Sequence, residues 1–421
     1  METLYINGGN KLYGDIEVAT AKNAILPILA GAIMSNGIVE LDKVTPFSDV
    51  EIMLDILDSL GCKVERSGDS VTIDSSNISS YYIREEYTKL VRSSIFMLGP
   101  MLTKLHKARV AYPGGCNIGN RPIDLHLKGL EDLNVKIEER HGFIECDGRN
   151  MKAGEVHLDF PSVGATENLM MASVMLKGTT TIHNAAREPE IEDLQNFLNS
   201  MGAKVYGAGT SELVIHGVDS LHGTRFTPIK DRIIAGTYMI ACAMTGGEVC
   251  LKNVDFRHNI ALINKLKQAG TKIKTKGNNI IVESRGKPRS ISVETLPYPG
   301  FPTDLQNQIL TLATIAKGTS VITENLYESR LKISHELSKM GANIAVKNRM
   351  AIITGVGTLY GANVEACDLR CGASLVLAGL VAKGYTVVHN IHHIDRGYLN
   401  IEEDLCRLNA EIRRIDKQKD I

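Results

Sequence analysis

The stretch LNSMGAKV, residues 198–205, is one of six copies of a phrase that recurs along the whole chain. Each copy has the form expected where an amphipathic helix ends at a capping glycine and the chain enters a strand. A spacing of roughly 70 residues is longer than a solenoid repeat, so each unit is expected to be a small αβ module. The other copies are LDSLGCKV from Leu57, LEDLNVKI from Leu130, LKQAGTKI from Leu266, LSKMGANI from Leu337 and LCRLNAEI from Leu405.

A helix-length apolar segment precedes every copy of the phrase. The six segments are residues 23–34, 92–102, 167–175, 232–244, 305–316 and 374–382. Several are apolar on nearly all sides, which is typical of a buried helix, and they are too short to span a membrane. A short alternating strand follows, such as GEVCL at 247–251, and alternation indicates one face in water. The unit is therefore predicted to be β-α-β-α-β-β, with helices inside and sheets outside.

The fold class that these units predict is α/β, with two inverse (inside-out) αβ domains of three units each. The last unit ends after EIRRI at 411–415 without its final strand, whereas LYI at 4–6 has no partner in the first unit. Pairing the two ends assigns residues 1–21 and 229–421 to one domain and residues 22–228 to the other. The chain then crosses twice between the domains, near Thr20 and near Pro228, which is typical of a hinge.

The composition limits the classes of partner. The 421 residues include 47 Lys plus Arg and 48 Asp plus Glu, and a net charge of -1 with no basic tail supports neither a nucleic acid nor a membrane surface as partner. The start METLYINGGNKLYG has neither a basic nor an apolar leader region, so a soluble cytoplasmic protein is expected. The sequence does not predict an oligomeric state.

The cysteines and histidines do not predict a metal site. Eight cysteines are scattered singly apart from Cys367 and Cys371, and their spacing supports neither disulfides nor zinc. His389, His392 and His393 lack companion ligands at metal-site spacing, which favours ordinary strand and loop histidines. We expect no bound metal.

The loop AYPGGCNIGNR, residues 111–121, combines a cysteine, three glycines and an arginine. Its glycines permit positive φ, bring backbone N–H groups close to a ligand and allow the loop to move as a lid. Arg121 and the start of a helix predicted at 123–133 favour the thiolate form of Cys116. A reactive thiol is one interpretation and a surface turn with an incidental buried thiol is the other, and the loop alone does not separate them.

Polar or charged residues stand at the start of each predicted buried helix. Capping alone explains residues such as Thr303 and Asp231. Lys22, Arg92 and Arg370 are different, because a cation at the positive end of a helix is unfavourable by roughly 0.3–1 kcal/mol unless an anion lies beside it. A negative group is therefore expected near these three side chains.

A second set of cations consists of arginines at nearly equivalent repeat positions. Packing on a sheet or pairing with an acidic neighbour explains one or two of them, Arg257 first. Guanidinium groups match carboxylate and phosphate in a bidentate way, so a cleft lined from both domains is expected to bind a ligand with several anionic groups. Neither a P-loop nor a Rossmann glycine motif occurs. The set is Arg121, Arg187, Arg257, Arg330 and Arg396.

The motifs, taken in order, carry a family resemblance over the full length. They are Lys22-Asn23, PGGCNIGNRP, SVGATEN, NAAREPEI, FPTDLQ, the segment around Arg330, DLRCGASLVLAG and HIDRGY. The chain thereby resembles the UDP-N-acetylglucosamine 1-carboxyvinyltransferases, a family of enolpyruvyl transferases. The resemblance implies two inverse αβ domains and transfer of enolpyruvate from phosphoenolpyruvate to the sugar 3'-hydroxyl, with release of phosphate. It also implies the first committed step of peptidoglycan synthesis, no metal, no organic cofactor, and small-molecule substrates as the partners.

The resemblance further implies roles for individual residues. Cys116 matches the loop cysteine that gives a proton to the phosphoenolpyruvate methylene group, can form a covalent adduct and is alkylated by epoxides of the fosfomycin type. Asp304 matches the aspartate placed at the sugar 3'-hydroxyl. The implied phosphate-binding cations are Lys22, Arg121 and Arg396, the first and last counted as catalytic, and Arg330 and Arg370 are the implied carboxylate-binding cations. The other implied substrate contacts are Asn23, Arg92, Pro122, Ile123, Asp124, Leu125, Ser162, Val163, Gly164 and Leu326.

Two alternatives remain at this point. One is a 5-enolpyruvylshikimate-3-phosphate synthase, which shares fold and phosphoenolpyruvate, although the glycine-rich cysteine loop argues against it. The other is a paralogue that binds a nucleotide sugar without turnover. One departure from the family pattern is Phe160, where some members carry lysine, so an ionic nucleotide contact at that position is not expected.

Overall fold

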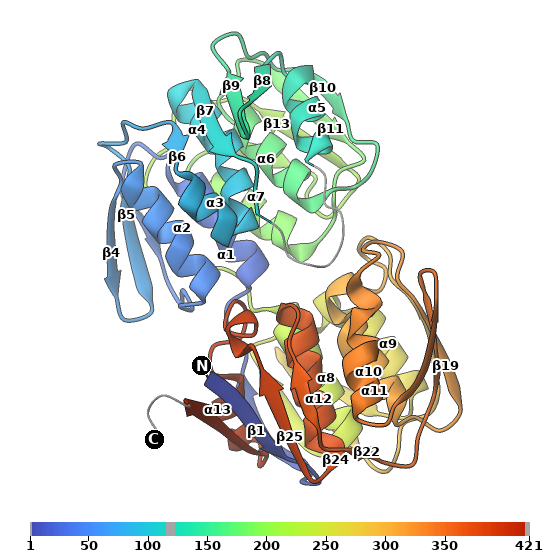
Figure 1. Cartoon of the computed structure of the whole chain (residues 1–421). Coiled ribbons are helices and arrows are strands. Elements are labelled where there is room, and N and C mark those ends of the chain that lie inside the picture. The colour runs from blue at the N-terminus through green and yellow to red at the C-terminus, as the bar shows by residue number, and fades with distance from the viewer. Residues whose placement is uncertain (1, 115–122, 417–421) are drawn as a thin grey trace. The chain divides into compact units, whose positions relative to one another are not determined.

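The structure is a computed structural model that describes residues 2–114 and 123–416. The described chain forms two compact units, both visible in Figure 1. The middle unit runs from Thr20 to Ile229, and the terminal unit contains the residues up to Ala19 and those from Lys230 onward.

Three four-stranded sheets belong to the middle unit. Their strands are β3 (Val39–Leu41), β4 (Lys63–Ser67), β5 (Ser70–Asp74), β6 (Tyr82–Ile83), β7 (Lys107–Ala111), β8 (Lys136–Arg140), β9 (Phe143–Asp147), β10 (Glu155–His157), β11 (Thr179–His183), β12 (Lys204–Tyr206), β13 (Glu212–His216) and β14 (Thr224–Phe226). The strand orders are β14-β3-β5-β4, β6-β7-β9-β8 and β10-β11-β13-β12. In each sheet the first two strands are parallel and the other pairs are antiparallel, so the three repeats share one topology.

The terminal unit repeats this topology three times. Its strands are β1 (Glu2–Asn7), β2 (Leu12–Glu17), β15 (Gly247–Lys252), β16 (Lys272–Lys276), β17 (Asn279–Ser284), β18 (Ser292–Glu294), β19 (Thr319–Thr323), β20 (Asn343–Lys347), β21 (Met350–Thr354), β22 (Leu359–Tyr360), β23 (Asn363–Glu365), β24 (Ala382–Lys383), β25 (Tyr385–His389) and β26 (Glu411–Asp416). The strand orders are β16-β17-β15-β2, β18-β19-β21-β20 and β23-β25-β1-β26, with a small additional pair β22-β24.

The two ends of the chain meet in one sheet. Strand β1 lies between β25 and β26 and is antiparallel to both, with Leu4 opposite Val388 on one side and Arg414 on the other. The predicted pairing of the two ends is therefore confirmed. In the middle unit, the last strand likewise pairs with the first sheet, because β14 lies parallel to β3.

Buried helices form the core of each unit, as predicted. In the middle unit they are α1 (Lys22–Ala32), the 3-10 segment η1 (Arg92–Met97) continuing into α4 (Leu98–Leu105), and α6 (Val163–Ser173). In the terminal unit they are α8 (Arg232–Thr245), η3 (Thr303–Leu305) continuing into α10 (Gln306–Thr314), and α12 (Leu369–Val381). Every residue of α10 is buried, including Gln306, Asn307 and Gln308. The strands expose one face, so the inside-out layering is observed.

Along the chain, an amphipathic helix lies between two strands of each four-stranded sheet. These helices are α2 (Ser48–Ser59), α5 (Asp124–Asp132), α7 (Pro189–Ser200), α9 (Ile260–Gln268), α11 (Ile333–Lys339) and α13 (Ile401–Arg407), with η2 (Phe256–Asn259), η4 (Arg330–Lys332) and η5 (Ile391–His393) before the last three. A further helix, α3 (Glu85–Leu90), precedes η1. On α7, Ile191, Leu194 and Phe197 are buried while Glu192 is exposed, which is the expected helical period. Within the described ranges, no helix is long and apolar enough to cross a membrane.

The capping position of the repeated phrase has positive φ in all six copies. It is glycine in four copies and asparagine in two, and asparagine is the residue that best tolerates this conformation after glycine. The observed φ values are 101° at Gly61, 65° at Asn134, 98° at Gly202, 101° at Gly270, 88° at Gly341 and 77° at Asn409. The backbone thus turns from helix to strand at the predicted positions.

Candidate active site

The terminal unit brings Asp304, Arg330 and Arg370 together from η3, η4 and the first turn of α12. Arg330 Nη2 donates to Asp304 Oδ1 at 2.5 Å, and Arg370 Nη2 donates to Asp304 Oδ2 at 2.9 Å. The Arg330 and Arg370 side chains are buried, whereas the Asp304 side chain is 23% exposed. One carboxylate therefore pairs with two guanidinium groups, so the cluster has a net positive charge. The Asp304 carboxylate within it is partly exposed to solvent.

The charges in this cluster set the protonation of Asp304. Burial by itself raises the pKa of Asp304, but the charges of Arg370 and Arg330, together with their hydrogen bonds, hold it well below its usual value. Burial likewise lowers the pKa of Arg370, but the charge of Asp304, the other nearby groups and the hydrogen bond to Asp304 together raise it above its usual value. Asp304 is therefore ionised and a weak base for as long as both arginines bind it.

An aromatic ring lies beside each arginine, and a backbone carbonyl also holds Arg330. Arg330 Nη1 donates to the Thr303 carbonyl at 2.6 Å, and its guanidinium carbon lies 5.1 Å from the centre of the Tyr327 ring. The Arg370 guanidinium carbon lies 6.0 Å from the centre of the Tyr398 ring. Such contacts orient a guanidinium group for bidentate binding of a planar anion.

Glu324 orders the segment around this cluster and was not identified from the sequence. It is buried directly after β19. Its Oε1 accepts hydrogen bonds from the backbone N–H groups of Leu326 at 2.8 Å and Tyr327 at 3.0 Å, and its Oε2 accepts one from the Thr303 hydroxyl at 2.8 Å. Leu326, a predicted substrate contact, is half-buried in this turn. A charged residue immediately after an alternating strand is the signal that could have identified Glu324.

The predicted cap at Thr303 is wrong. Its hydroxyl donates to Glu324, and η3 begins without a side-chain cap. Thr303 is the first residue of η3 and Pro302 occupies the N-cap position, which accounts for the difference. Asp304 is consequently held by ion pairs and is not left free in the first turn. The predicted cap at Asp231 is confirmed, because its carboxylate accepts from the N–H groups of Ile233 and Ile234 at 2.7 and 2.9 Å.

In the middle unit, Lys22 is the buried first residue of α1. Its Nζ lies 2.6 Å from Asp49 Oδ2, and both residues are buried. The negative groups that the sequence analysis expected beside Lys22 and Arg370 are thus supplied in part by the chain itself, as Asp49 and Asp304. Asn23 follows Lys22 and is half-buried.

The predicted nucleotide-binding residues of the middle unit converge through Asn168 on α6. The Asn168 side chain donates to the Ile95 carbonyl in η1 at 2.9 Å and lies 2.8 Å from His126 Nδ1 on α5. Gly164 lies against the His126 ring, because a Cβ there would approach the ring to 3.0 Å. The starts of η1, α5 and α6 are therefore neighbours. These helix starts carry the half-buried Arg92 and the predicted residues Ile123, Asp124, Leu125, Ser162, Val163 and Gly164.

The middle unit also buries carboxyl groups that the sequence analysis did not single out. Glu167 on α6 is fully buried, and neither of its side-chain oxygens has a hydrogen-bond partner among the described residues. Burial, followed by the charges of Glu190 and Glu188, raises the pKa of Glu167 well above its usual value. Burial also raises the pKa of Asp193 on α7 to about 7, although the Ile229 N–H donates to it at 3.1 Å.

Several predicted site residues are not part of these clusters. Cys116, Arg121 and Pro122 lie outside the described residues. Arg396 is half-buried in the turn after η5. Arg257 pairs with Asp255 at 2.5 Å, which confirms its expected ordinary ion pair.

Comparison with known proteins places the chain in a family. The family model described as EPSP synthase (3-phosphoshikimate 1-carboxyvinyltransferase) matches residues 6–405. A protein named UDP-N-acetylglucosamine 1-carboxyvinyltransferase 2, from Caldanaerobacter subterraneus subsp. tengcongensis, is 50% identical over 411 residues, which cover 97% of this chain and 99% of that protein. UDP-N-acetylglucosamine 1-carboxyvinyltransferase 1 of Clostridium perfringens is 47% identical over 421 residues, covering 99% and 100%.

Solved structures share the fold at lower identity. The crystal structure of the enolpyruvyl transferase NikO from Streptomyces tendae has a TM-score of 0.89 and 22% identity, covering 98% of this chain and 99% of the other. An EPSP synthase from Acinetobacter baumannii has a TM-score of 0.76 and 19% identity, covering 99% and 100%.

Proposed function

Because the chain belongs to the enolpyruvyl transferases, we infer that it transfers the enolpyruvyl group of phosphoenolpyruvate to the 3'-hydroxyl of UDP-N-acetylglucosamine and releases phosphate. The observation that carries this inference is the 50% identity, over 97% of the chain, to a UDP-N-acetylglucosamine 1-carboxyvinyltransferase. The EPSP synthase alternative is a more distant relative, with 19% identity.

The proposed reaction would be the first committed step of peptidoglycan synthesis. That step serves cell-wall biogenesis, and through it cell shape, the cell cycle and cell division. We propose that the enzyme acts in the cytoplasm on these two small-molecule substrates, with no metal or organic cofactor in the reaction.

We propose that Arg330 and Arg370 bind the carboxylate of phosphoenolpyruvate. A substrate carboxylate competes with Asp304 for the two guanidinium groups that hold it at 2.5 and 2.9 Å. Loss of one of these bonds raises the pKa of Asp304, so that its basicity increases when substrate arrives. Asp304 then accepts the proton of the 3'-hydroxyl as the sugar oxygen bonds to C2 of phosphoenolpyruvate.

The remaining catalytic roles complete the addition and the elimination. As the sugar oxygen attacks C2, the electron pair of the C2=C3 bond takes up a proton at C3. We propose that Cys116 donates this proton. The tetrahedral adduct then loses phosphate from C2 and a proton from C3, which restores the double bond. Lys22, Arg121 and Arg396 are the cations proposed to stabilise the departing phosphate.

The sugar nucleotide is proposed to contact the middle-unit residues that Asn168 brings together. Arg92, residues 123–125 and residues 162–164 stand at three neighbouring helix starts, where backbone N–H groups favour anions. Asn23, Pro122 and Leu326 complete the proposed contacts. Phe160, 44% exposed, offers a ring face and no charge.

Epoxides of the fosfomycin type test the role of Cys116. We expect them to alkylate Cys116 ahead of the buried thiols, because burial raises the pKa of Cys242 to about 12 and leaves little of the reactive thiolate. Cys116→Ser should resist alkylation and lose most turnover, whereas Cys116→Asp, which retains an acid, should keep part of it. Labelling mainly at Cys242 or Cys371 contradicts the assignment.

The decisive experiment compares phosphate release from phosphoenolpyruvate with two acceptors. UDP-N-acetylglucosamine should support release, and shikimate 3-phosphate should not. The opposite preference would make the chain an EPSP synthase. Binding of UDP-N-acetylglucosamine without phosphate release would make it a non-catalytic nucleotide-sugar-binding protein.

A further inference from the structure

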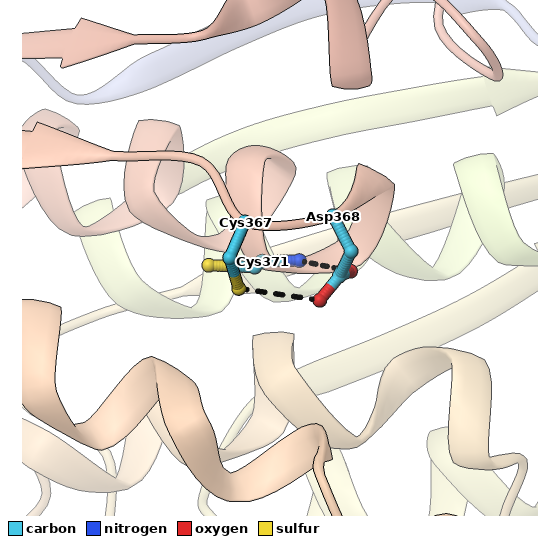
Figure 2. A group of neighbouring side chains, drawn as sticks. All are labelled: Cys367, Asp368 and Cys371. Atoms are coloured by element: carbon cyan, nitrogen blue, oxygen red, sulfur yellow. Dashed lines mark hydrogen bonds between the residues drawn. The ribbon is translucent and has the colours of Figure 1, made fainter. Parts of the chain in front are cut away.

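Cys367, Asp368 and Cys371 form a compact group at the start of α12 in the terminal unit (Figure 2). The two sulfur atoms and a carboxylate oxygen all lie within 4.8 Å of one another. Asp368 and Cys371 are buried, whereas Cys367 is half-buried, so the group can be reached from the side of Cys367. Neither thiol takes part in the reaction proposed above.

The two oxygens of Asp368 are used differently. Oδ1 accepts hydrogen bonds from the backbone N–H groups of Arg370 at 2.8 Å and Cys371 at 3.0 Å, which caps α12. Oδ2 lies 3.5 Å from Cys367 Sγ, which donates to it, as Figure 2 shows. The capping bonds fix the carboxylate in the way that outer hydrogen bonds orient a metal ligand. A cation that replaces the thiol protons therefore leaves the cap intact.

We propose that Cys367, Asp368 and Cys371 bind one thiophilic divalent metal ion of the zinc class. Thiolate sulfur and carboxylate oxygen both bind zinc, at about 2.3 and 2.0–2.2 Å, so two ligands at a tetrahedral angle stand about 3.5–3.8 Å apart. Ligand atoms within 4.8 Å need only a small adjustment to reach that spacing. Three protein ligands leave the fourth position for water. Magnesium and calcium are disfavoured, because they prefer oxygen ligands alone.

The spacing of the two cysteines gave no indication of this site. The third ligand is a helix-capping aspartate between them, and only the fold turns its second oxygen toward the sulfurs. Binding converts two thiols to thiolates and releases two protons to solvent for each metal ion. The positive end of α12 favours both thiolates, which offsets part of the repulsion between the incoming cation and the helix end.

Cadmium alone is a suitable probe, because cadmium–thiolate bonds give an ultraviolet charge-transfer band that counts the thiolates. The titration uses the full chain carrying Cys116→Ser, which removes the loop thiol. We expect a band that saturates at one cadmium per chain, release of two protons per cadmium in weakly buffered solution, and displacement by zinc but not by magnesium. Cys367→Ser and Cys371→Ser should each lose about half of the band and bind cadmium roughly 10–100-fold more weakly.

Two further variants make the result specific. Asp368→Asn keeps a good capping side chain but loses the charge, so cadmium should bind roughly tenfold more weakly while the helix cap persists. Cys406→Ser removes an exposed thiol elsewhere in the terminal unit and should change neither band nor stoichiometry. An absent band, a band that survives Cys367→Ser, or one that Cys406→Ser abolishes would overturn the proposal. Cys367 is half-buried, so its variant tests the site even if Cys371→Ser folds poorly.

Discussion

In the terminal unit, Asp304 is held by two guanidinium groups, whereas in the middle unit Glu167 is fully buried without a hydrogen-bond partner among the described residues. Both side chains lie at or near the start of a core helix, in repeats with the same sheet topology. The arginines hold the pKa of Asp304 well below its usual value, although burial alone would raise it. Burial raises the pKa of Glu167 well above its usual value.

The difference shows that the repeated scaffold does not determine the chemistry of a site. Core helices of the two units carry carboxyl groups in opposite protonation states, because two arginines pair with Asp304, whereas Glu167 has no hydrogen-bond partner among the described residues and lies near the charges of Glu190 and Glu188. An ionised carboxylate paired with cations suits the binding of anions and the transfer of protons. A neutral buried carboxyl group can donate a proton or a hydrogen bond, but it has no charge with which to hold guanidinium groups. The raised pKa values of Glu167 and Asp193 also make the stability of the middle unit depend on pH.

The largest effect is expected for Asp304→Asn, which makes the terminal unit resemble the middle unit by removing the charge that pairs with both arginines. The amide retains size and part of the hydrogen bonding but cannot accept the 3'-hydroxyl proton. We expect kcat to fall at least about a hundredfold, while the folded variant still binds UDP-N-acetylglucosamine. Steady-state kinetics and equilibrium binding measure the two quantities.

Asp255→Asn is the matched control for that variant. Asp255 also pairs with an arginine, at 2.5 Å, but the Arg257 side chain is 74% exposed. We expect wild-type kcat in this control. A near-wild-type kcat in Asp304→Asn would remove Asp304 from the mechanism and leave the hydroxyl proton without an acceptor.

The second effect tests the paired carboxylate of the middle unit. Asp49→Asn leaves the buried Lys22 without the ion partner that lies 2.6 Å away. Breaking a buried ion pair in this way typically costs about 3–5 kcal/mol of unfolding free energy. Glu65→Gln, which breaks the exposed pair of Lys63 and Glu65, should leave the denaturation midpoint unchanged. Equal midpoints for the two variants would show that Asp49 does not hold Lys22.

The fold was largely predictable because its signals are local. The apolar segments predicted the core helices, and the capping glycines predicted the turns at which φ is positive, as at Gly202 and Gly341. The strand at 4–6 also found its predicted partner at the other end of the chain, because an incomplete sixth unit left only one place for it.

The ionic partners of the candidate site could not be predicted in the same way. Arg370 lies 66 positions from Asp304, and nothing local indicates that their side chains meet. The sequence predicted that the cations need a negative group, but it could not distinguish a ligand from a residue of the chain such as Asp49. The partner of the Thr303 hydroxyl was missed for the same reason, since Glu324, which accepts its hydrogen bond, lies 21 positions away along the chain.

The third effect is the pH dependence of stability, which should have opposite signs for Asp193 in the middle unit and Asp304 in the terminal unit. The pKa of Asp193 is about 7, because burial raises it from its usual value near 4. Between these two values the folded state keeps a proton that the unfolded chain releases, so the stability of the middle unit falls as pH rises from about 4 to about 7. Asp193→Asn should remove the share of this dependence that Asp193 supplies, so that the change in stability between pH 5 and pH 8 becomes smaller by at most about 3 kcal/mol.

Denaturation midpoints at pH 5 and pH 8 measure that slope. Asp132→Asn, on the exposed face of α5, is the control and should leave the slope unchanged. Asp304 contributes with the opposite sign, because the stability that its ion pairs supply is lost as pH falls below the usual aspartate pKa. A wild-type slope in Asp193→Asn would show that Asp193 is ionised throughout this range.

The smallest effect compares the helix caps of the two units. In the terminal unit, Asp231 accepts hydrogen bonds from two backbone N–H groups, at 2.7 and 2.9 Å, so Asp231→Ala should cost about 1–2 kcal/mol of stability. In the middle unit, the Ser162 hydroxyl accepts one hydrogen bond, from the Ala165 N–H at 3.4 Å. This distance is longer than that of an ordinary hydrogen bond, so the bond is weak. Ser162→Ala should therefore cost only about 0.5 kcal/mol.

If the half-buried Ser162 contacts the nucleotide sugar as proposed, the same variant should raise KM for UDP-N-acetylglucosamine about fivefold to tenfold, which is the loss expected for one hydrogen bond of about 1 kcal/mol. Denaturation and kinetics on the same preparation separate the two roles, because capping alone predicts a loss of stability with an unchanged KM.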